Sequence, residues 1–388
     1  MPERIAPNVL SWASELDDLT REQAATTARL PILAGHLALM PDAHLGKGAT
    51  IGSVIPTDSA VIPSAVGVDI GCGMAARRLD LTQDGLPDSL EPWVKEMEST
   101  VPAGLGRWHG EPSDDALSWF AEHPPPPTLD DQRKAAAQLG TLGSGNHFIE
   151  LAADEDARIW ILLHSGSRGG GNKLATLHTK TARKLHEGLG TRLEDPELAW
   201  LQEGTPEFDA YIRDLRWSQA FARENRRLML SSTHRALETV LGREVATVDE
   251  VNCHHNFTER EEHSGRAVWV TRKGAIRARV GDRGLIPGAM GQRSYVIRGL
   301  GNEASYESCA HGAGRRMSRR QARKQLTLES FGEAMGAAVW QHTSARALLD
   351  EHPSAYKPID VVMRDQADLV EIEHELHGIA NYKGVERR

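Results

Sequence analysis

The sequence contains too few cysteines for a disulfide framework, because Cys72, Cys253 and Cys309 are the only three in 388 residues. Disulfide-dependent secreted domains are rich in cysteine, so this count indicates a reducing compartment. No apolar run approaches the roughly 20 residues that a membrane helix needs. The first residues also lack the apolar centre of a signal peptide. We therefore expect a cytoplasmic protein without a membrane partner.

Several nucleotide-binding and hydrolase motifs are absent as well. No Gly-x-Gly-x-x-Gly motif lies between a clear strand and a helix, which argues against a Rossmann dinucleotide site. Gly46-Lys47-Gly48 lacks the spacing of a P-loop. Ser165 is not surrounded by the nucleophile-elbow pattern of serine hydrolases. No internal repeat is evident.

Hydrophobic residues make up 40% of the chain and charged residues 26%, which is typical of a globular protein with a sizeable core. Apolar runs bounded by turn residues predict strands, and helical periodicity recurs between them without a sustained βαβ order. Strands are expected at 147–151, 158–163, 267–271, 275–280 and 294–298, and helices at 130–139, 173–189 and 206–241. The motifs before and after Pro124-Pro125-Pro126-Pro127 match in character. We predict an α+β fold with mixed sheets and surrounding helices, in one domain over 1–388, with a proline-rich surface loop near 122–128.

Charge is unevenly distributed along the chain. The formal net charge is −9, yet the segment 266–324 carries fourteen Lys or Arg residues against only Asp282, Glu303 and Glu307. Such a local excess is what a phosphate-bearing partner requires, so this segment predicts a surface that binds a nucleic-acid backbone. The alternative is a solvated face whose acidic partners come from elsewhere in the fold.

The stretch Gly67-Val-Asp-Ile-Gly-Cys-Gly-Met74 places three glycines around Asp69 and Cys72. Glycines allow a sharp turn and a close approach, and a carboxylate beside a thiolate forms half of a metal site. A cysteine buried in a tight turn is the alternative interpretation. Four further stretches place histidines beside Gly or Asn, and their histidines are His147, His164, His254, His255 and His311. Together these contexts favour a shared site for several metal ions.

The ligand types do not settle which metal it is. Cysteine with several histidines favours zinc by softness, whereas a carboxylate and an open coordination sphere for phosphate oxygens allow manganese. The sequence Glu371-Ile-Glu-His-Glu-Leu-His377 also contains metal-binding residue types. We interpret it as the solvated face of a polar helix. Glycine-rich backbone around 287–291 and 312–314 is suited to a nucleotide polyphosphate, because free N–H groups bind phosphates.

The same stretches closely resemble the RtcB family of RNA-splicing ligases. The resemblance covers nearly the whole chain, in family order. The matching motifs are Met40-Pro-Asp-Ala-His-Leu-Gly-Lys-Gly-Ala-Thr-Ile-Gly-Ser-Val-Ile-Pro56, Val66-Gly-Val-Asp-Ile-Gly-Cys-Gly-Met74, Leu142-Gly-Ser-Gly-Asn-His-Phe-Ile-Glu150, Leu163-His-Ser-Gly-Ser-Arg-Gly169, Asn252-Cys-His-His-Asn256, Ile286-Pro-Gly-Ala-Met-Gly291 and Cys309-Ala-His-Gly-Ala-Gly-Arg315.

The resemblance implies the family's α+β fold and its chemistry. Members join an RNA 3′-phosphate or 2′,3′-cyclic phosphate to a 5′-hydroxyl with GTP and Mn²⁺, in tRNA splicing or RNA repair. It replaces the zinc preference with two manganese ions, which Cys72 bridges, and His311 becomes the guanylylated nucleophile. The implied metal ligands are Asp69, Cys72, His147, His164 and His255. The implied guanylate contacts are Asn146, Glu150, Asn256, Pro287, Gly288, Ala289, Met290, Ser294, Gly312, Ala313, Gly314 and Lys383.

One expectation comes from chemistry rather than from the resemblance. We expect Asp42 to hydrogen-bond one nitrogen of His311 and leave the other free to attack, as carboxylates do for catalytic histidines. The alternative is that Asp42 caps its own turn. A metal-dependent phosphoesterase and a nucleotide-dependent RNA-binding module are the competing functions. The sequence does not determine the physiological RNA, activity on DNA ends, the oligomeric state, the role of the proline-rich loop, or the need for an activating protein.

Overall fold

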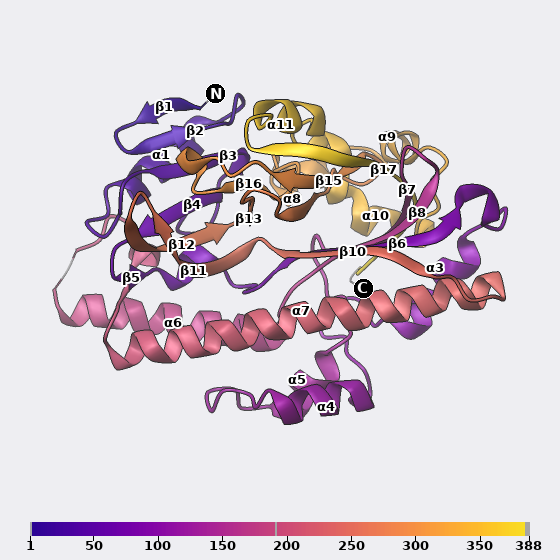
Figure 1. Ribbon diagram of the computed structural model, residues 1–388, viewed down its shortest axis with the longest axis horizontal. Helices are drawn as coiled ribbons and strands as arrows, with labels where there is room; N and C mark the ends of the chain where they lie inside the picture. Colours follow the sequence, from indigo (N-terminus) through magenta and orange to yellow (C-terminus); the bar gives the residue numbers. More distant parts are fainter. Residues whose placement is uncertain (1, 191, 385–388) are drawn as a thin grey trace.

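In the computed structural model, which describes residues 2–190 and 192–384, two large sheets are flanked by helices (Figure 1). The expected α+β class is confirmed. The six-stranded sheet has the order β1 (Glu3–Ala6), β2 (Val9–Ser11), β3 (Leu37–His44), β4 (Ile51–Thr57), β12 (Arg266–Lys273) and β11 (Asn256–His263). The seven-stranded sheet has the order β10 (Thr247–His254), β6 (Gly73–Thr82), β8 (Arg158–Ser165), β7 (Phe148–Ala153), β17 (Val370–Lys383), β15 (Arg293–Gly299) and β14 (Arg283–Ile286). Two short ribbons pair β13 (Ala275–Arg277) with β16 (Ser308–Ala310) and β5 (Ala60–Val61) with β9 (Leu201–Gln202).

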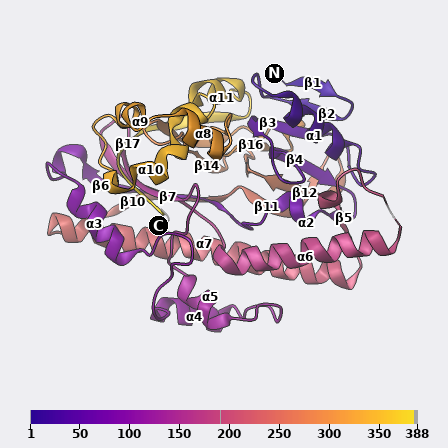
Figure 2. The same cartoon turned by 180° about the vertical axis from the view of Figure 1, so that it is seen from behind.

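The helices lie on both sides of these sheets. Two long helices run next to each other along one side of the molecule in both views, and α4 and α5 lie beyond them, away from the sheets (Figures 1 and 2). The helices are α1 (Asp18–Ala28), α2 (Pro63–Val66), α3 (Glu91–Thr100), α4 (Asp114–Glu122), α5 (Gln132–Gln138), α6 (Arg168–Gly188), α7 (Pro206–Leu241), α8 (Arg319–Gln325), α9 (Leu328–Met335), α10 (Ala345–Leu348) and α11 (Ile359–Asp365). Within the described ranges, no helix has both the length and the apolar character needed to cross a membrane.

The longest helix, α7, has clear signals at both ends. The Thr205 hydroxyl accepts a hydrogen bond from the N–H of Phe208, and Pro206 occupies the first turn, where its missing N–H costs nothing. The helix ends at Gly242, whose φ of +65° is the left-handed conformation that glycine adopts most readily. Its apolar face packs on the seven-stranded sheet, so α7 serves as a long support beneath β6 and β8.

The largest core lies between the seven-stranded sheet, α3 and α7. Trp93 of α3, Leu163 of β8 and Met229 of α7 are fully buried there. Burying a side chain of this size contributes about 1.5–3 kcal/mol. Because β8 is apolar on both faces, it lies in the interior of the sheet, and its polar end at His164 is held in a fixed position.

The C-terminal segment corrects one sequence prediction. Residues 371–377 do not form a polar helix but lie in β17, which pairs with β15 on one side and with β7 on the other. The charged residues suit a strand because they meet opposite charges on neighbouring strands. Glu373 pairs with Arg283 and Arg298. Cross-strand pairing therefore outweighed the helical pattern.

The proline-rich segment lies at the surface, and the residue after it contacts the two long helices. It follows α4 as an extended stretch in which Pro126 is buried and its neighbours are half-buried or exposed. Just after it, the Thr128 hydroxyl donates to Asp214 of α7, whose carboxylate also lies 2.8 Å from His178 Nε2 on α6. These two contacts to Asp214 link the segment to α7 and, through His178, to α6.

Candidate metal and nucleotide site

Four neighbouring strands bring the candidate metal ligands to one edge of the seven-stranded sheet. β10, β6, β8 and β7 are all antiparallel to their neighbours, so the ends of β10 and β8 lie beside the starts of β6 and β7. His164 lies opposite Met74 and Phe148, and His254 lies opposite Gly73. The residues just outside these strand ends, Cys72, His147 and His255, therefore meet at the same edge.

The ligand atoms approach one another closely. The Nε2 atom of His147 lies 3.1 Å from Asp69 Oδ2 and 3.5 Å from Cys72 Sγ. The Nε2 atom of His164 lies 3.3 Å from Cys72 Sγ and 3.3 Å from Nε2 of His255. All five residues expected to bind metal are thus brought together by the fold.

These distances fit metal coordination. Ligands about 2.1 Å from one ion at tetrahedral angles lie about 3.4 Å apart. The contacts form two overlapping groups, Asp69–His147–Cys72 and Cys72–His164–His255, which share the thiol. This arrangement is suited to two neighbouring ions with the sulfur of Cys72 between them.

The hydrogen bonds of His147 and His164 leave the Nε2 atom of each ring free to bind a metal. Nδ1 of His147 lies 2.9 Å from the carbonyl oxygen of Leu142, and Nδ1 of His164 lies 3.3 Å from that of Asn146. A proton on Nδ1 directed at a carbonyl leaves the lone pair on Nε2. Burial holds the pKa of His164 and of His255 well below the ordinary histidine value, so both rings are neutral.

The acidic ligands carry opposite pKa shifts. Burial, followed by the nearby charge of Asp69, raises the pKa of the Cys72 thiol well above its usual value. For Asp69, burial acts to raise the pKa, but the hydrogen bond and charge of His147 outweigh it and lower the pKa to about 2. A metal cation would supply the positive charge that the thiolate needs.

His311 lies beside this cluster at the end of β16. Its ring is 4.8 Å from that of His255, centroid to centroid. Nδ1 of His311 is 2.6 Å from Oδ2 of Asp42, and the same oxygen accepts hydrogen bonds from the backbone N–H groups of His311 and Gly312. Asp42 is fully buried on β3 and is directed at His311 across 269 residues of sequence. Nε2 of His311 has no hydrogen-bond partner among the described residues.

Two glycines make these close approaches feasible. A Cβ on Gly166 would lie 2.2 Å from Oδ1 of Asp69, so any side chain there would displace the carboxylate. A Cβ on Gly314 would lie 2.2 Å from the carbonyl oxygen of Asp42, and its φ of +71° also disfavours other residues. The glycines of the motifs therefore have steric roles at the site.

One cavity of about 580 Å³ joins the cluster to the expected nucleotide-binding residues. Asp69, Cys72, His164, His255 and His311 line it, whereas His147 faces a second cavity and Asp42 lies behind His311. All twelve residues expected to contact guanylate also line it. These are Asn146, Glu150, Asn256, Pro287, Gly288, Ala289, Met290, Ser294, Gly312, Ala313, Gly314 and Lys383.

Sequence analysis missed several residues that complete this cavity. Nδ2 of Asn381 donates to Oε2 of Glu150 at 2.9 Å, and Nζ of Lys383 lies 2.8 Å from Oε2 of Glu351. Burial raises the pKa of Glu150 to about 7, although Asn381 and Lys383 act to lower it. The lysine pairs with Glu351, a residue that no motif singles out. Only the pairing of β7 with β17 places Asn381 beside Glu150.

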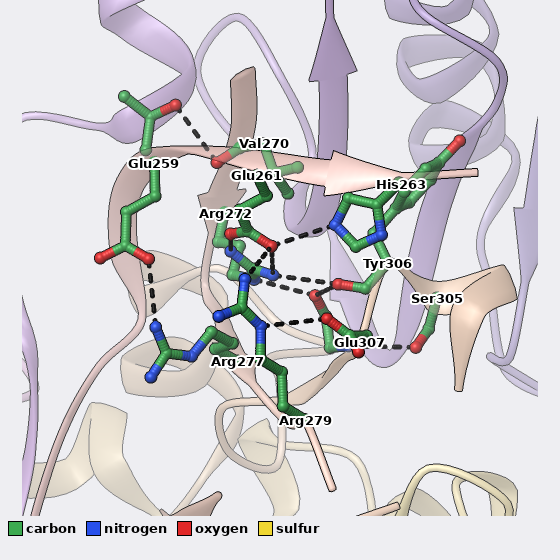
Figure 3. Close-up of polar contacts among 12 residues, drawn as sticks. Glu259, Glu261, His263, Val270, Arg272, Arg277, Arg279, Ser305, Tyr306 and Glu307 are labelled. Carbon is green, nitrogen blue, oxygen red and sulfur yellow. Dashed lines mark hydrogen bonds and ion pairs between the residues drawn. The ribbon is translucent and has the colours of Figure 1, made fainter. Parts of the chain in front are cut away.

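The basic segment 266–324 is mostly neutralised, which corrects the prediction of a free cationic surface. Arg272 is fully buried against Glu261, and Arg279 pairs with Glu261 and Glu307 (Figure 3). Further members with carboxylate partners are Arg266, Arg277, Arg283, Arg293, Arg298, Arg315, Arg319 and Arg323. Asp282 and Glu307 belong to the segment itself, but Asp58, Asp350 and Glu373 come from elsewhere in the sequence, as the alternative interpretation required.

The network in Figure 3 also contacts β16, the strand that ends directly before His311. Nε of Arg272 donates to the hydroxyl of Ser308 at 2.8 Å, and its Nη2 donates to the carbonyl oxygen of Tyr306 at 3.0 Å. Glu261, His263 and Glu307 come close enough to suggest a second metal site. Because Arg272 and Arg279 already pair with these carboxylates, the cluster is better described as a buried ion-pair network.

Comparison with known proteins gives consistent matches. A family model described as tRNA-splicing ligase RtcB matches residues 23–121 and 119–384. An RNA-splicing ligase RtcB of Escherichia coli (strain K12) is 44% identical over 391 aligned residues, which cover 94% of each chain. A tRNA-splicing ligase RtcB of Thermococcus kodakarensis is 30% identical over 435 residues, covering 94% of this chain and 89% of the relative.

Proposed function

The chain belongs to the RtcB family, and on that basis we propose that it is an RNA ligase that joins 3′-phosphate or 2′,3′-cyclic phosphate ends to 5′-hydroxyl ends, with GTP and Mn²⁺. One observation carries the proposal: His311 and four of the five candidate metal ligands, Asp69, Cys72, His164 and His255, open into the same cavity as the twelve candidate guanylate contacts. Residues from His44 to Lys383 line this cavity, so we propose that 1–388 acts as one catalytic domain.

In the proposed first step, His311 acts as a nucleophile. Asp42 holds Nδ1, so the lone pair on Nε2 attacks the α-phosphorus of GTP. A P–N bond forms, the P–O bond to the β-phosphate breaks, and pyrophosphate leaves. Residues 313 and 314, with the side chains of Arg315 and Lys383, line the cavity, where the backbone N–H groups and the two cations would bind phosphate oxygens.

An end that carries a 2′,3′-cyclic phosphate must first be opened by water to a 3′-phosphate and a 2′-hydroxyl. Two displacements at phosphorus then complete the reaction. An oxygen of the RNA 3′-phosphate attacks the guanylyl phosphorus, the P–N bond breaks, and the imidazole of His311 is restored. The 5′-hydroxyl oxygen then attacks the RNA 3′-phosphorus, the P–O bond to GMP breaks, and the hydroxyl proton is released. GMP is a better leaving group than the oxide that a bare phosphate would have to expel.

The donor set fits two metal ions. Asp69, Cys72 and His147 would hold one, and Cys72, His164 and His255 the other. Bound there, Mn²⁺ would polarise phosphate oxygens and offset the charge of the approaching anions. The protein's own contribution is to keep His164 and His255 neutral and to hold Asp69 ionised.

Replacing Asp42 with asparagine is expected to slow guanylylation of His311 strongly. A neutral amide is a weaker acceptor for Nδ1–H than a carboxylate and does not stabilise the positive charge that forms on the ring, and a comparable change in a catalytic triad costs about 10⁴-fold. The amide oxygen can still accept from the backbone N–H groups of His311 and Gly312, so the melting temperature should stay close to that of the wild type. The single-turnover rate of protein labelling by α-labelled GTP measures the effect. Labelling at the wild-type rate would eliminate the orienting role.

Guanine recognition is expected to weaken as the pH falls below about 7. Ionised Glu150 accepts hydrogen bonds from N1–H and N2–H of guanine, which adenine cannot offer. Since burial raises its pKa to about 7 in the free protein, Glu150 becomes neutral below that pH and loses an acceptor. The affinity should fall by up to about tenfold per pH unit below the pKa. Calorimetric titration with guanosine between pH 5.5 and 8 tests this, and a Glu150→Gln variant should show weak, pH-independent binding.

The proposed function is tested with two synthetic RNAs, one ending in a 3′-phosphate and one beginning with a 5′-hydroxyl. We expect a joined product only with GTP and Mn²⁺, and none when ATP replaces GTP. Removal of the 3′-phosphate without joining or protein labelling would favour a phosphoesterase. RNA binding without any chemical change would favour a binding module.

A further inference from the structure

Two consecutive residues of α7, Asn225 and Arg226, contact the turns that carry the candidate metal ligands. The helix packs on β6, β8 and β10, three of the strands whose ends form the cluster. Both side chains are fully buried, although neither belongs to a motif singled out in the sequence or lines the nucleotide cavity. Burying such polar groups is costly unless they are hydrogen-bonded, so their hydrogen-bond partners indicate what the two residues do.

Arg226 connects three of these turns. Its Nη1 donates to the carbonyl oxygens of Gly71 and Ser165 at 2.9 and 3.0 Å. Its Nη2 lies 3.1 Å from Nδ1 of His254, and its Nε donates to Oδ1 of Asn252 at 2.9 Å. The planar guanidinium fork is suited to bridge several acceptors at once. Three of the partners are direct sequence neighbours of candidate metal ligands, which are Cys72, His164 and His255.

Asn225 connects a different pair of segments. Its Oδ1 accepts hydrogen bonds from the N–H groups of Gly140 and Thr141 at 2.7 and 3.1 Å. Its Nδ2 donates to the hydroxyl of Ser165 and to the carbonyl oxygen of Gly166, both at 3.2 Å. The side chain therefore joins the loop that precedes one histidine ligand to the turn that follows another.

Further hydrogen bonds lead from these two segments to two metal ligands. The hydroxyl of Ser165 donates to the carbonyl oxygen of Leu142 at 3.0 Å, and the same oxygen lies 2.9 Å from Nδ1 of His147. Two residues further along the turn, the N–H of Ser167 donates to Oδ1 of Asp69 at 2.9 Å. Both of these ligands belong to the group that would hold one and the same ion.

The shared ligand depends less on Arg226 than the histidines do. The N–H of Gly71 donates to the carbonyl oxygen of Asn256 at 2.7 Å, and the N–H of Cys72 donates to that of Asp69 at 3.1 Å. These backbone hydrogen bonds keep the turn of Cys72 closed when the contact from the guanidinium is lost.

We propose that Asn225 and Arg226 are positioning residues, each for the ligands of a different metal ion. Asn225 holds the ligands of the first ion, and Arg226 holds those of the second. The ligands that the ions do not share are Asp69 and His147 for the first and His164 and His255 for the second. The inference rests on the two-ion site of the proposed function and assigns its support to one helix.

The test is a titration of the metal-free protein with Mn²⁺, in which electron paramagnetic resonance of the unbound ion gives both dissociation constants. Arg226→Met and Asn225→Ala should each weaken one ion about 10–100-fold, the usual loss when a residue that orients metal ligands is removed, and change the other by less than about threefold. Arg227→Met is the matched control, because this neighbouring arginine is half exposed and pairs with Glu224. It should keep both ions at wild-type affinity.

Milder variants separate positioning from a loss of folding. Arg226→Lys keeps the charge but not the fork, and Asn225→Ser keeps one hydroxyl, so each should weaken the same ion as the larger change, by a smaller factor. Melting temperatures of the metal-free proteins are measured alongside. If Arg226→Met or Asn225→Ala does not fold, the milder variant decides for that residue. A lowered melting temperature with unchanged Mn²⁺ affinities would mean that the residues only stabilise the fold, which overturns the proposal.

The double variant Arg226→Met/Asn225→Ala shows whether the two residues serve different ions. It should hold neither ion tightly. One ion retained at wild-type affinity would mean that both residues support the same ion, and equal weakening of both ions by a single variant would mean that its effect is general. Either result overturns the proposal. Failure of the wild type to bind two Mn²⁺ ions would instead contradict the proposed metal site itself.

Discussion

Replacing His311 with alanine is expected to abolish covalent labelling of the protein by α-labelled GTP and, with it, the joining of RNA. The reason is chemical, since Nδ1 of His311 lies 2.6 Å from the buried carboxylate of Asp42, which leaves Nε2 as the atom available to attack. Without a P–N bond, GMP cannot be passed to the RNA. The label on the wild-type protein should be labile to acid and stable to base, as a phosphoramidate is.

The matched control is His377→Ala. This histidine is largely exposed on β17, lies outside the cavity and, among the described residues, pairs only with Glu375, so its loss should leave labelling unchanged. RNA already guanylylated at its 3′ end provides a second check, because it bypasses the first step. His311→Ala should still join such RNA to a 5′-hydroxyl strand. Wild-type labelling in His311→Ala would place the nucleophile elsewhere and contradict the mechanism.

Replacing Cys72 with alanine is expected to remove both metal ions rather than one. The thiol lies 3.5 Å from Nε2 of His147 and 3.3 Å from Nε2 of His164, between the two groups of ligands. Loss of residues that only orient metal ligands typically costs 10–100-fold in metal affinity, so loss of a shared ligand should cost at least about 100-fold at each site. Activity should disappear with the metal.

Metal content after dialysis, together with titration of the metal-free protein by Mn²⁺, measures this loss. Cys253→Ala is the control, because Cys253 is a free cysteine on β10 outside the cluster, and it should keep two ions per chain. One ion retained by Cys72→Ala would mean that the sulfur is not shared. Preferential uptake of Zn²⁺ with full activity would correct the identity of the metal while leaving the ligand set in place.

Local sequence patterns predicted much of the secondary structure. The helix over 206–241 was predicted at the boundaries that the structure shows. The structure explains why these boundaries are local: Thr205 caps the start, Pro206 occupies the first turn and Gly242 ends the helix. The strands containing 158–163 and 294–298 were also expected, since their apolar runs are bounded by turn residues. Residues 371–377 were predicted wrongly, because the charges of β17 are satisfied by Arg283, Arg298 and other side chains that no local pattern reveals.

The basic segment illustrates the same limit. Counting charges along 266–324 predicted a free cationic surface, but a linear count cannot see that Glu261, Glu373 or Asp350 folds against it. Conversely, Arg168 lies in the motif Leu163–Gly169, but nothing in that motif shows whether its charge is paired. Only the structure shows that no carboxylate of the described chain lies within ion-pair distance of its guanidinium group.

The sequence by itself determined the chemical types at the site: one carboxylate, one thiol, several histidines and glycine-rich backbone, each in a short motif with its own turn. These are local properties, which neighbouring residues specify. Only the tertiary structure decided which of them meet. The antiparallel order β10–β6–β8–β7 brings the strand ends together, and the approach of β3 to β16 sets Asp42 against His311. The second cavity, which His147 faces, belongs to this class too, because Trp108, Lys134 and Arg168 become neighbours only when the loop 105–108, α5 and α6 pack against one another.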